Sequence, residues 1–325
     1  MQVTSSNTNP SQTNVLYEEM EKKISKDDFK KLVKLGDSHR GVVYTATWKK
    51  ITDMIAVKAF HDSCLPDYRK CEYNDYFGVP DHPNLITRHG ICDYPGKHAL
   101  LMELMQTSLD KRIEHYDTTE TKMPFGERNY IAVNVARGVA FLHSHDVIHG
   151  ELKSPNVLLN FLTGGKIDVK LSDFASPFRK ESRSLHGHEK PLAVRWQIHD
   201  SRRTDKEYCK TCDVYSLSLV IWEMFAMRIP FPTLTQREVF QKLNSNEREI
   251  VPTDCLPIYR KIIVSCWGYI LEERPTSEKV HVHLNKFKEL DEKVSLVPYL
   301  PLLSEIVSIV KELLFSQSIK ELNEF

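Results

Sequence analysis

The sequence predicts a two-lobed α+β protein in which a small strand-rich part is followed by a larger helical part. Between Phe29 and about Cys92 the chain has short apolar or alternating runs separated by polar turns, the pattern of β-strands. From Tyr130 onward apolar residues recur at spacings of three and four, which is the helical period. Strands and helices segregated along a chain are typical of the α+β class. The 325 residues are enough to bury a large core.

The first elements along the chain are a tail and a set of strands. Residues 1–14 are polar, and we expect a disordered tail there. A charged, helix-prone lead-in follows at residues 15–28. We assign residues 29–105 to the N-terminal lobe. Its clearest strands are the apolar runs at Val42 to Trp48 and at Met54 to Phe60.

We assign residues 106–292 to the C-terminal lobe and expect it to be mainly helical. One helix begins near Tyr130 and carries an apolar stripe that consists of Ile131, Val135, Val139 and Leu142. A mostly buried helix spans Leu217 to Phe225, where Glu223 is the one charged residue. Further helices are expected at Ile258 to Tyr269 and at Val280 to Leu290.

Residues 293–325 form a separate C-terminal extension with the pattern of a broad amphipathic helix. Leu302, Ile306, Ile309 and Leu313 form one apolar stripe, and polar residues fall opposite. Three interpretations are open for this helix: it docks on its own domain, it contacts a protein partner or a second copy, or it lies on a membrane surface. The polar face has no Lys/Arg cluster, which argues against the membrane.

Charge and composition exclude several classes of protein. The chain has 44 Lys and Arg against 44 Asp and Glu, and this balance argues against nucleic-acid binding, which needs a basic surplus. We find no transmembrane segment and no signal-peptide core, so we expect a cytoplasmic protein. Its seven cysteines, an odd number, are expected to be reduced thiols. The only tight pair is Cys209-Lys-Thr-Cys212, and a zinc site would need a second ligand pair that we do not find.

Four segments that carry chemistry occur in a fixed order. They are Gly36-Asp-Ser-His-Arg-Gly41-Val-Val43, Ile55-Ala-Val-Lys58, His149-Gly-Glu-Leu-Lys-Ser-Pro-Asn156 and Ser172-Asp-Phe-Ala175. The set resembles the protein-kinase signature of glycine-rich loop, strand lysine, catalytic loop and metal-binding Asp-Phe-Gly. Asp213-Val-Tyr-Ser-Leu-Ser and the pair Cys266-Trp267 with Arg274-Pro-Thr276 extend the resemblance to tyrosine-kinase-like families. It covers about residues 29–290 and implies the two-lobed kinase fold.

The resemblance implies an ATP site with Mg²⁺. Its phosphate loop would consist of Gly36, Ser38 and Gly41, and Lys58 would hold the α- and β-phosphates. The lysine needs a carboxylate to orient it, and Glu72 is the expected partner, with Asp75 as a weaker candidate. Asn156 and Asp173 would be the oxygen ligands of Mg²⁺.

The resemblance also implies where adenine would lie. Val43 and Ala56 would cover it from one side and Leu158 from the other. The run from Leu100 to Met105 is predicted to be a strand that leads into the hinge between the lobes. Within it Met102 would be the gatekeeper, and Glu103 to Met105 would offer backbone hydrogen bonds to adenine.

The departures from the family pattern concern catalysis. Glu151 stands where the family has its catalytic Asp, and its longer side chain shifts the carboxylate by more than about 1 Å, a misplacement that can cost roughly 10²-fold in rate. Gly150 replaces the arginine that in the family pairs with a phosphorylated loop. Ala175, Ser38 and Ser218 replace glycines, in a chain with only 12 glycines where about 23 would be usual.

These departures predict a pseudokinase that binds ATP weakly and acts in signalling as a scaffold or allosteric regulator of a protein partner, through its lobes or its C-terminal helix. The alternative is an active but slow serine/threonine kinase, because Lys153 beside Glu151 resembles the catalytic loop of that type. A third possibility is an interaction module that works without a nucleotide. For His149 we expect packing or a hydrogen bond to the backbone.

Overall fold

A computed structural model describes residues 29–38, 41–48, 54–61, 78–94, 97–174, 195–196 and 209–295 of the chain. By its internal contacts the chain divides into two compact units. The first consists of Met1–Gln106 with Ala175–Gly187, and the second of Thr107–Phe174 with His188–Phe325. The first unit is a curled antiparallel sheet and the second is mainly helical, so the predicted α+β fold is confirmed.

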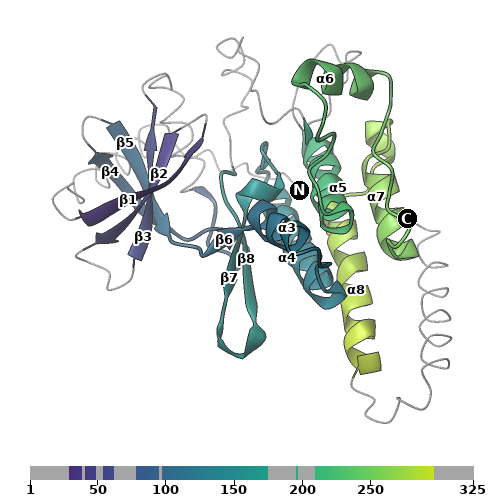
Figure 1. Cartoon of the computed structure of the whole chain (residues 1–325), viewed down its shortest axis with the longest axis horizontal. Helices are drawn as coiled ribbons and strands as arrows, with labels where there is room; N and C mark the ends of the chain where they lie inside the picture. The colour runs from purple at the N-terminus through teal and green to yellow at the C-terminus, as the bar shows by residue number, and fades with distance from the viewer. Residues whose placement is uncertain are drawn as a thin grey trace, which may run out of the picture. The chain divides into compact units, whose positions relative to one another are not determined.

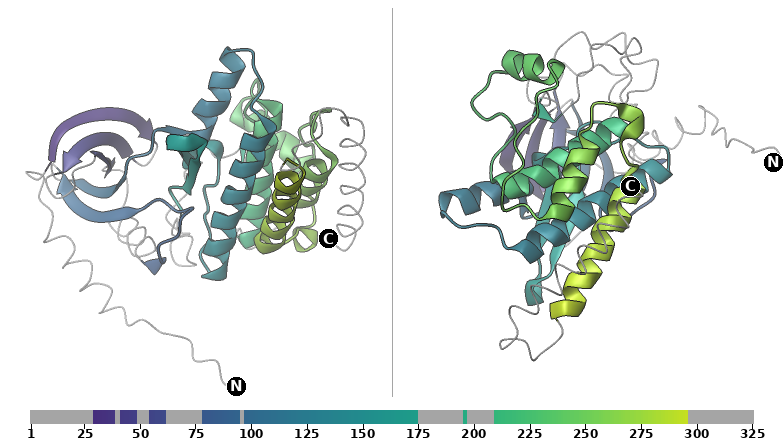
Figure 2. Two further views of the ribbon diagram at one scale, coloured as in Figure 1. Left: turned by 90° about the horizontal axis from the view of Figure 1, so that it is seen from below. Right: turned by 90° about the vertical axis from the view of Figure 1, so that its right-hand side faces the viewer.

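The first unit contains a five-stranded sheet in the order β1-β2-β3-β5-β4, and all of its neighbouring strands are antiparallel. Its strands are β1 (Phe29–Ser38), β2 (Gly41–Trp48), β3 (Met54–Phe60), β4 (Arg88–Tyr94) and β5 (Lys97–Glu103). Figure 2 shows how strongly the first strands curl. Phe29, Trp48, Ile55, Val57 and Leu101 are buried in one apolar cluster of this sheet. The runs predicted at Val42 to Trp48 and at Met54 to Phe60 are therefore β2 and β3.

The start of β2 requires glycine. A Cβ atom added at Gly41 would lie 2.2 Å from the backbone oxygen of Ala59 on β3, where no side chain fits. Ser38 is paired with Gly41 in the register, so β1 and β2 form a hairpin with two residues between their ends. A Cβ atom at Gly36, by contrast, would meet nothing within 4 Å.

The second unit combines a small sheet with a set of helices (Figure 1). The sheet consists of β6 (Thr107–Ser108), β7 (Val157–Phe161) and β8 (Ile167–Leu171). The helices are α3 (Leu109–Thr118), α4 (Phe125–Ser144), α5 (Lys210–Ala226), α6 (Gln236–Asn244), α7 (Pro257–Cys266) and α8 (Ser277–Ser295). Three short 3₁₀ helices are η2 (Ser154–Asn156), η3 (Thr163–Gly165) and η6 (Leu271–Glu273). Helix α4 packs along α8, and α5 packs on both α4 and α7.

The apolar stripe predicted near Tyr130 lies on α4, where Ile131, Val135, Val139 and Leu142 are all buried. The helix predicted at Leu217 to Phe225 is the buried part of α5. These two predictions are confirmed because the apolar faces that define them pack against each other in the core.

Several predicted helix ends and one strand end were wrong. Helix α4 begins at Phe125 and not near Tyr130, and α5 begins at Lys210 and not at Leu217. Helix α7 ends at Cys266 and not at Tyr269, because Trp267 donates the last helical bond and Gly268 follows it. Helix α8 begins at Ser277, after Pro275, and runs beyond Leu290 to Ser295. Strand β5 ends at Glu103 and not at Met105.

Several predictions fall on residues that the structure does not describe. They are the tail at 1–14, the lead-in at 15–28 and the amphipathic stripe after Pro301. Within the described ranges, every helix is too short or too polar to cross a membrane.

Candidate functional site

Lys58 is a buried cation in the first unit. It lies on β3, paired in the register with Val43 on β2 and Leu100 on β5, and only 2% of it is exposed. Its ammonium group lies 5.5 Å from the centre of the Phe60 ring. Lysine is rarely buried this fully without a functional or ionic partner. Its expected partner Glu72, and also Asp75, lie outside the described residues.

The residues expected around adenine lie on neighbouring strands of this unit. Ala56 on β3 is paired with Met102 on β5, and both are buried. Val43 on β2 is half-buried. Leu158, the residue expected on the opposite side of adenine, is a half-buried residue of β7 in the second unit. The sheet thus brings three of the four residues onto adjacent strands.

The expected hinge segment is fixed by Glu103. Its amide donates to the Thr87 carbonyl at 3.0 Å, and its Oε1 atom accepts from the Thr87 amide at 2.6 Å. The Glu103 amide is therefore already used within the first unit. Met105 has a buried side chain, and its backbone makes no hydrogen bond to any other residue in the described ranges. The Met105 amide therefore has capacity to donate to a ligand.

The phosphate loop is described only in part. Gly36 is half-buried and lies opposite Val43, and Ser38 closes the hairpin opposite Gly41. Lys34 and Asp37 on β1 form an exposed ion pair at 2.6 Å. The tip at residues 39–40 is outside the described ranges.

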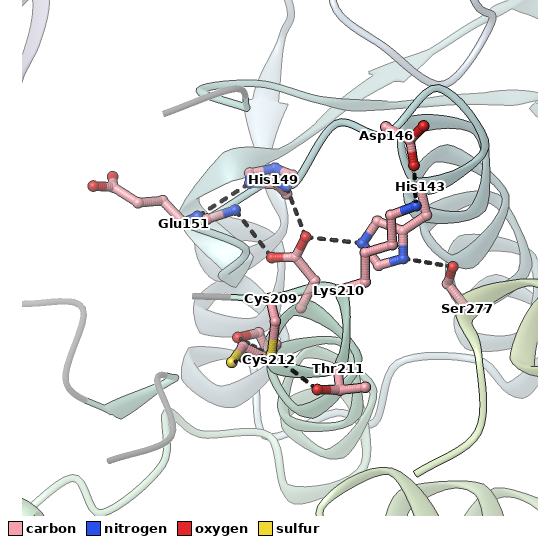
Figure 3. A network of polar contacts seen from close by, with 12 residues as sticks. His143, Asp146, His149, Glu151, Cys209, Lys210, Thr211, Cys212 and Ser277 are labelled. Atoms are coloured by element: carbon pink, nitrogen blue, oxygen red, sulfur yellow. Dashed lines mark hydrogen bonds and ion pairs between the residues drawn. The ribbon is translucent and has the colours of Figure 1, made fainter. Parts of the chain in front are cut away.

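In the second unit, Asp213 holds the catalytic loop. This fully buried residue of α5 accepts hydrogen bonds from the amide of His149 at 2.7 Å and from the amide of Gly150 at 3.0 Å. A third bond joins it to Nε2 of His143 at 3.0 Å, and His143 in turn bonds Ser277 (Figure 3). Because the Asp213 carboxylate can only accept, Nε2 of His143 donates to it, and Nδ1 lies 2.8 Å from the Ser277 hydroxyl.

Gly150 has a backbone conformation that suits glycine. Its φ of 77° lies in the left-handed region, which costs other L-residues about 1–2 kcal/mol. From the sequence, Gly150 was identified only as a replacement of the family arginine. In the structure, glycine also avoids the cost of a positive φ at a residue whose amide donates to Asp213.

His149 is a neutral, buried ring. Burial lowers its pKa, although Asp213, Asp173 and Glu151 act in the opposite direction. Its Nδ1 atom accepts from the Glu151 amide at 3.3 Å, and its ring lies edge-on to Phe174 with 6.4 Å between centres. The expected packing and backbone hydrogen bond of His149 are confirmed.

Glu151 itself is only 2% exposed, and its side chain points away from the His149 ring (Figure 3). Its backbone is fixed on both sides, by His149 at the amide and by Asn156, whose Nδ2 donates to the Glu151 carbonyl at 2.8 Å. The loop therefore positions residue 151 firmly, and the reach of its carboxylate is set by the glutamate side chain. Lys153, two residues later, is extended and half-buried.

Asn156 and Asp173 have the features of ligands for a hard cation. Since Nδ2 of Asn156 is used, its Oδ1 atom faces the other way, and within the described ranges it has no hydrogen-bond partner. The Asn156 carbonyl accepts from the amide of Ser172, which ties η2 to the residue before Asp173. Asp173 has a φ of 57°, in the left-handed region that aspartate adopts more readily than most residues. Phe174 is fully buried, and Ala175 lies outside the described residues.

A buried carboxylate whose role was not predicted from the sequence contacts the loop at Ser154. Glu223 on α5 accepts hydrogen bonds from the Ser154 hydroxyl and from the indole N–H of Trp196. Burial raises the pKa of Glu223 to about 8, while the two hydrogen bonds act to lower it. The available signal was a lone glutamate within an apolar helical run.

Comparison with known proteins agrees with this geometry. A sequence model described as "Protein tyrosine and serine/threonine kinase" matches residues 29–284. Tyrosine-protein kinase FRK of Homo sapiens is 27% identical over 84% of this chain and 54% of its own length. Serine/threonine/tyrosine-protein kinase HT1 of Arabidopsis thaliana is 29% identical over 64% of this chain and 52% of its own.

Dual specificity protein kinase shkD of Dictyostelium discoideum is 28% identical over 63% of this chain but only 27% of its own length. The chain thus spans about half, or less, of the length of these relatives. The family match itself extends over well more than half of the chain, from the first strand of the sheet into α8. By its fold, its ordered motifs and this match, the chain belongs to the protein tyrosine and serine/threonine kinase family.

Proposed function

We propose that this kinase domain binds ATP with Mg²⁺ but transfers phosphate poorly, and that it acts as a pseudokinase of the tyrosine-kinase-like type, a scaffold or allosteric regulator of a protein partner in signalling. The observation that carries the proposal is Glu151, a glutamate held by its backbone at the position where the family has its catalytic aspartate. ATP would supply the transferable phosphoryl group and Mg²⁺ would neutralise its charge.

Support for ATP binding comes from the first unit. Lys58 is a buried cation, and the adjacent Ala56 and Met102 present an apolar surface of the kind adenine needs. The Met105 amide has no partner in the described part of the chain, which suits a donor to an adenine nitrogen. Gly36, Ser38 and Gly41 would hold phosphate oxygens through their backbone, with less freedom at Ser38 than a glycine gives.

Support for Mg²⁺ binding comes from the second unit. Asn156 Oδ1 and the Asp173 carboxylate are oxygen donors of the type that Mg²⁺ takes. The Asn156 carbonyl accepts from the Ser172 amide at 2.9 Å, which fixes the residue before Asp173 next to η2.

Impaired transfer follows from two substitutions. The backbone of Glu151 is fixed, so the extra methylene of its side chain displaces the carboxylate from the position an aspartate would reach. Phosphoryl transfer depends almost wholly on positioning and electrostatics, so this displacement is costly. Gly150 has no guanidinium, and a phosphorylated activation loop would lack that partner.

The alternative function, a slow serine/threonine kinase, is favoured by Lys153. The family places a lysine there against the transferring phosphoryl group, and Lys153 is extended and half-buried in this loop. The relatives named above are described as tyrosine, serine/threonine/tyrosine and dual-specificity kinases. Their names therefore do not indicate whether serine, threonine or tyrosine would accept the phosphate.

A thermal-shift titration tests nucleotide binding. At an ATP concentration about 100-fold above Kd, binding adds about 2.7 kcal/mol to the free energy of unfolding, which raises the Tm by roughly 5–10 °C. We expect a shift with ATP and Mg²⁺, a smaller one without Mg²⁺, and none for Lys58→Ala. A wild-type protein that shows no shift with ATP in either condition contradicts the proposal.

A phosphotransfer assay with radiolabelled ATP tests the impairment. We expect incorporation close to background for wild type and an increase of up to roughly 10²-fold for Glu151→Asp, which restores the shorter side chain. Lys58→Ala in the Glu151→Asp background is the matched control and should abolish the gain. Wild-type incorporation that is strong and is lost in both Lys58→Ala and Glu151→Ala would establish the active kinase instead.

A further inference from the structure

Two cysteines meet at the first turn of α5. Cys209 is the N-cap residue of the helix, with φ −139° and ψ 168°, and Cys212 lies in the first turn. Their sulfur atoms are 3.0 Å apart (Figure 3). The Cys212 amide also donates to the Cys209 carbonyl at 2.9 Å, which fixes the two backbones close together. A disulfide bond is about 2.0 Å long, so bond formation needs the sulfurs to approach by only about 1 Å.

The two thiols are chemically different. Cys209 is half-buried, and it lies at a helix N-terminus, where the backbone dipole favours a thiolate. Its sulfur is also 2.9 Å from the Thr211 hydroxyl, which can donate to it. Cys212 is 3% exposed, and the hydrogen bond to Cys209 together with burial raises its pKa. Cys209 is therefore the sulfur that a small reagent meets first, and Cys212 is the one that stays protonated.

Other cysteines of the second unit lack this arrangement. Burial raises the pKa of Cys255 to about 11 and that of Cys266 to about 12. Both are buried, and within the described ranges neither has a hydrogen bond or close contact to a second sulfur. They are the internal reference for unreactive thiols in the same fold.

We propose that Cys209 and Cys212 form a reversible disulfide by exchange with a low-molecular-weight disulfide such as oxidised glutathione. The Cys209 thiolate attacks one sulfur of the reagent, breaks its S–S bond and releases one small thiol. Cys212 then loses its proton and attacks the Cys209 sulfur, which displaces the second small thiol. Two electrons pass from the pair to the reagent, and the two cysteine protons end on the two thiols released.

Cys212 lies one residue before a carboxylate that contacts the loop from His149 to Asn156. Asp213, which follows Cys212, is the carboxylate that holds the amides of His149 and Gly150. Disulfide formation depends on the distance between the two sulfurs, their exposure and their place at the helix end, and it requires neither ATP binding nor catalysis.

The experiment uses the full chain, equilibrated in glutathione buffers of increasing oxidised fraction, quenched with acid, alkylated and digested with trypsin. Trypsin cleaves after Lys206, Lys210 and Arg228. Reduced protein therefore gives peptides 207–210 and 211–228 separately, each alkylated. We expect these to be replaced by one disulfide-linked pair of peptides as the buffer becomes oxidising, and to return after dithiothreitol.

Two variants test the order of attack, and a third, at Cys266, is the control. Cys212→Ser should stop at a glutathione adduct on Cys209, and Cys209→Ser should leave Cys212 without an adduct. Cys266→Ser should form the linked peptides as wild type does. The proposal is wrong if both cysteines remain separately alkylated in the most oxidising buffer while circular dichroism shows native protein. It is also wrong if either sulfur links to a different cysteine instead.

Discussion

The substitution Asp213→Asn tests whether one buried carboxylate holds the catalytic loop. Asparagine has nearly the same shape, but one of its two terminal atoms is a donor. Asp213 accepts from three donors: the amides of His149 and Gly150 and the Nε2–H of His143. In the better orientation the new amide oxygen keeps His149 and His143, and the new NH₂ group faces the Gly150 amide, so that two donors oppose each other.

The magnitude follows from these contacts. A hydrogen bond to a charged acceptor contributes about 1.5–3 kcal/mol, and an unsatisfied buried donor costs about 1–3 kcal/mol. One lost bond and two weakened ones give a decrease of roughly 3 kcal/mol in the free energy of unfolding. For a protein of this size that corresponds to a decrease in Tm of about 6–12 °C.

Thermal unfolding followed by circular dichroism measures this decrease. The matched control is Asp146→Asn, the same chemical change at an exposed residue that is paired with Lys210 at 2.7 Å. Asp146 also has a φ of 57°, which asparagine tolerates. We expect the control to leave the Tm unchanged, because exposed ion pairs contribute little. A decrease below about 2 °C for Asp213→Asn would refute the reasoning.

Three further predictions concern the fold. Gly41→Ala should lower the free energy of unfolding by about 1–3 kcal/mol, because its Cβ would collide with the Ala59 backbone. Gly36→Ala is the control and should leave this free energy unchanged. Urea unfolding measures the free energy of unfolding for both variants. Gly150→Ala should cost about 1–2 kcal/mol in the same measurement, because its φ is positive. Glu223 has a pKa of about 8 in the folded protein and an ordinary carboxyl pKa near 4.5 when unfolded, so the folded state holds the extra proton between these values. The free energy of unfolding should therefore fall as pH rises from about 5 to 8. Glu223→Gln should remove the part of this fall that comes from Glu223. An identical pH profile of stability for wild type and Glu223→Gln would contradict the prediction.

Much of the fold was predictable from local pattern. The stripe on α4 and the apolar run of α5 identify helices because burial of one face, or of all faces, leaves a periodic signal in the sequence. Element ends were less predictable. Helix α7 stops at Cys266 because of Trp267 and Gly268, and this choice depends on packing of the tryptophan as well as on the glycine.

For the site, sequence alone determined the residue types: Lys58, Glu151, Asn156 and Asp173 stand in the order of the kinase motifs. It also determined that a glutamate stands at position 151, because chemical identity is read directly from the sequence. Tertiary structure decided which groups meet. The hydrogen bonds from Asp213 to the loop and from Ser154 to Glu223 join residues more than 60 positions apart, and the bond from Trp196 to Glu223 spans 27 positions. Such contacts leave no periodic trace along the chain, since they arise only when separate helices and loops are packed around a common core.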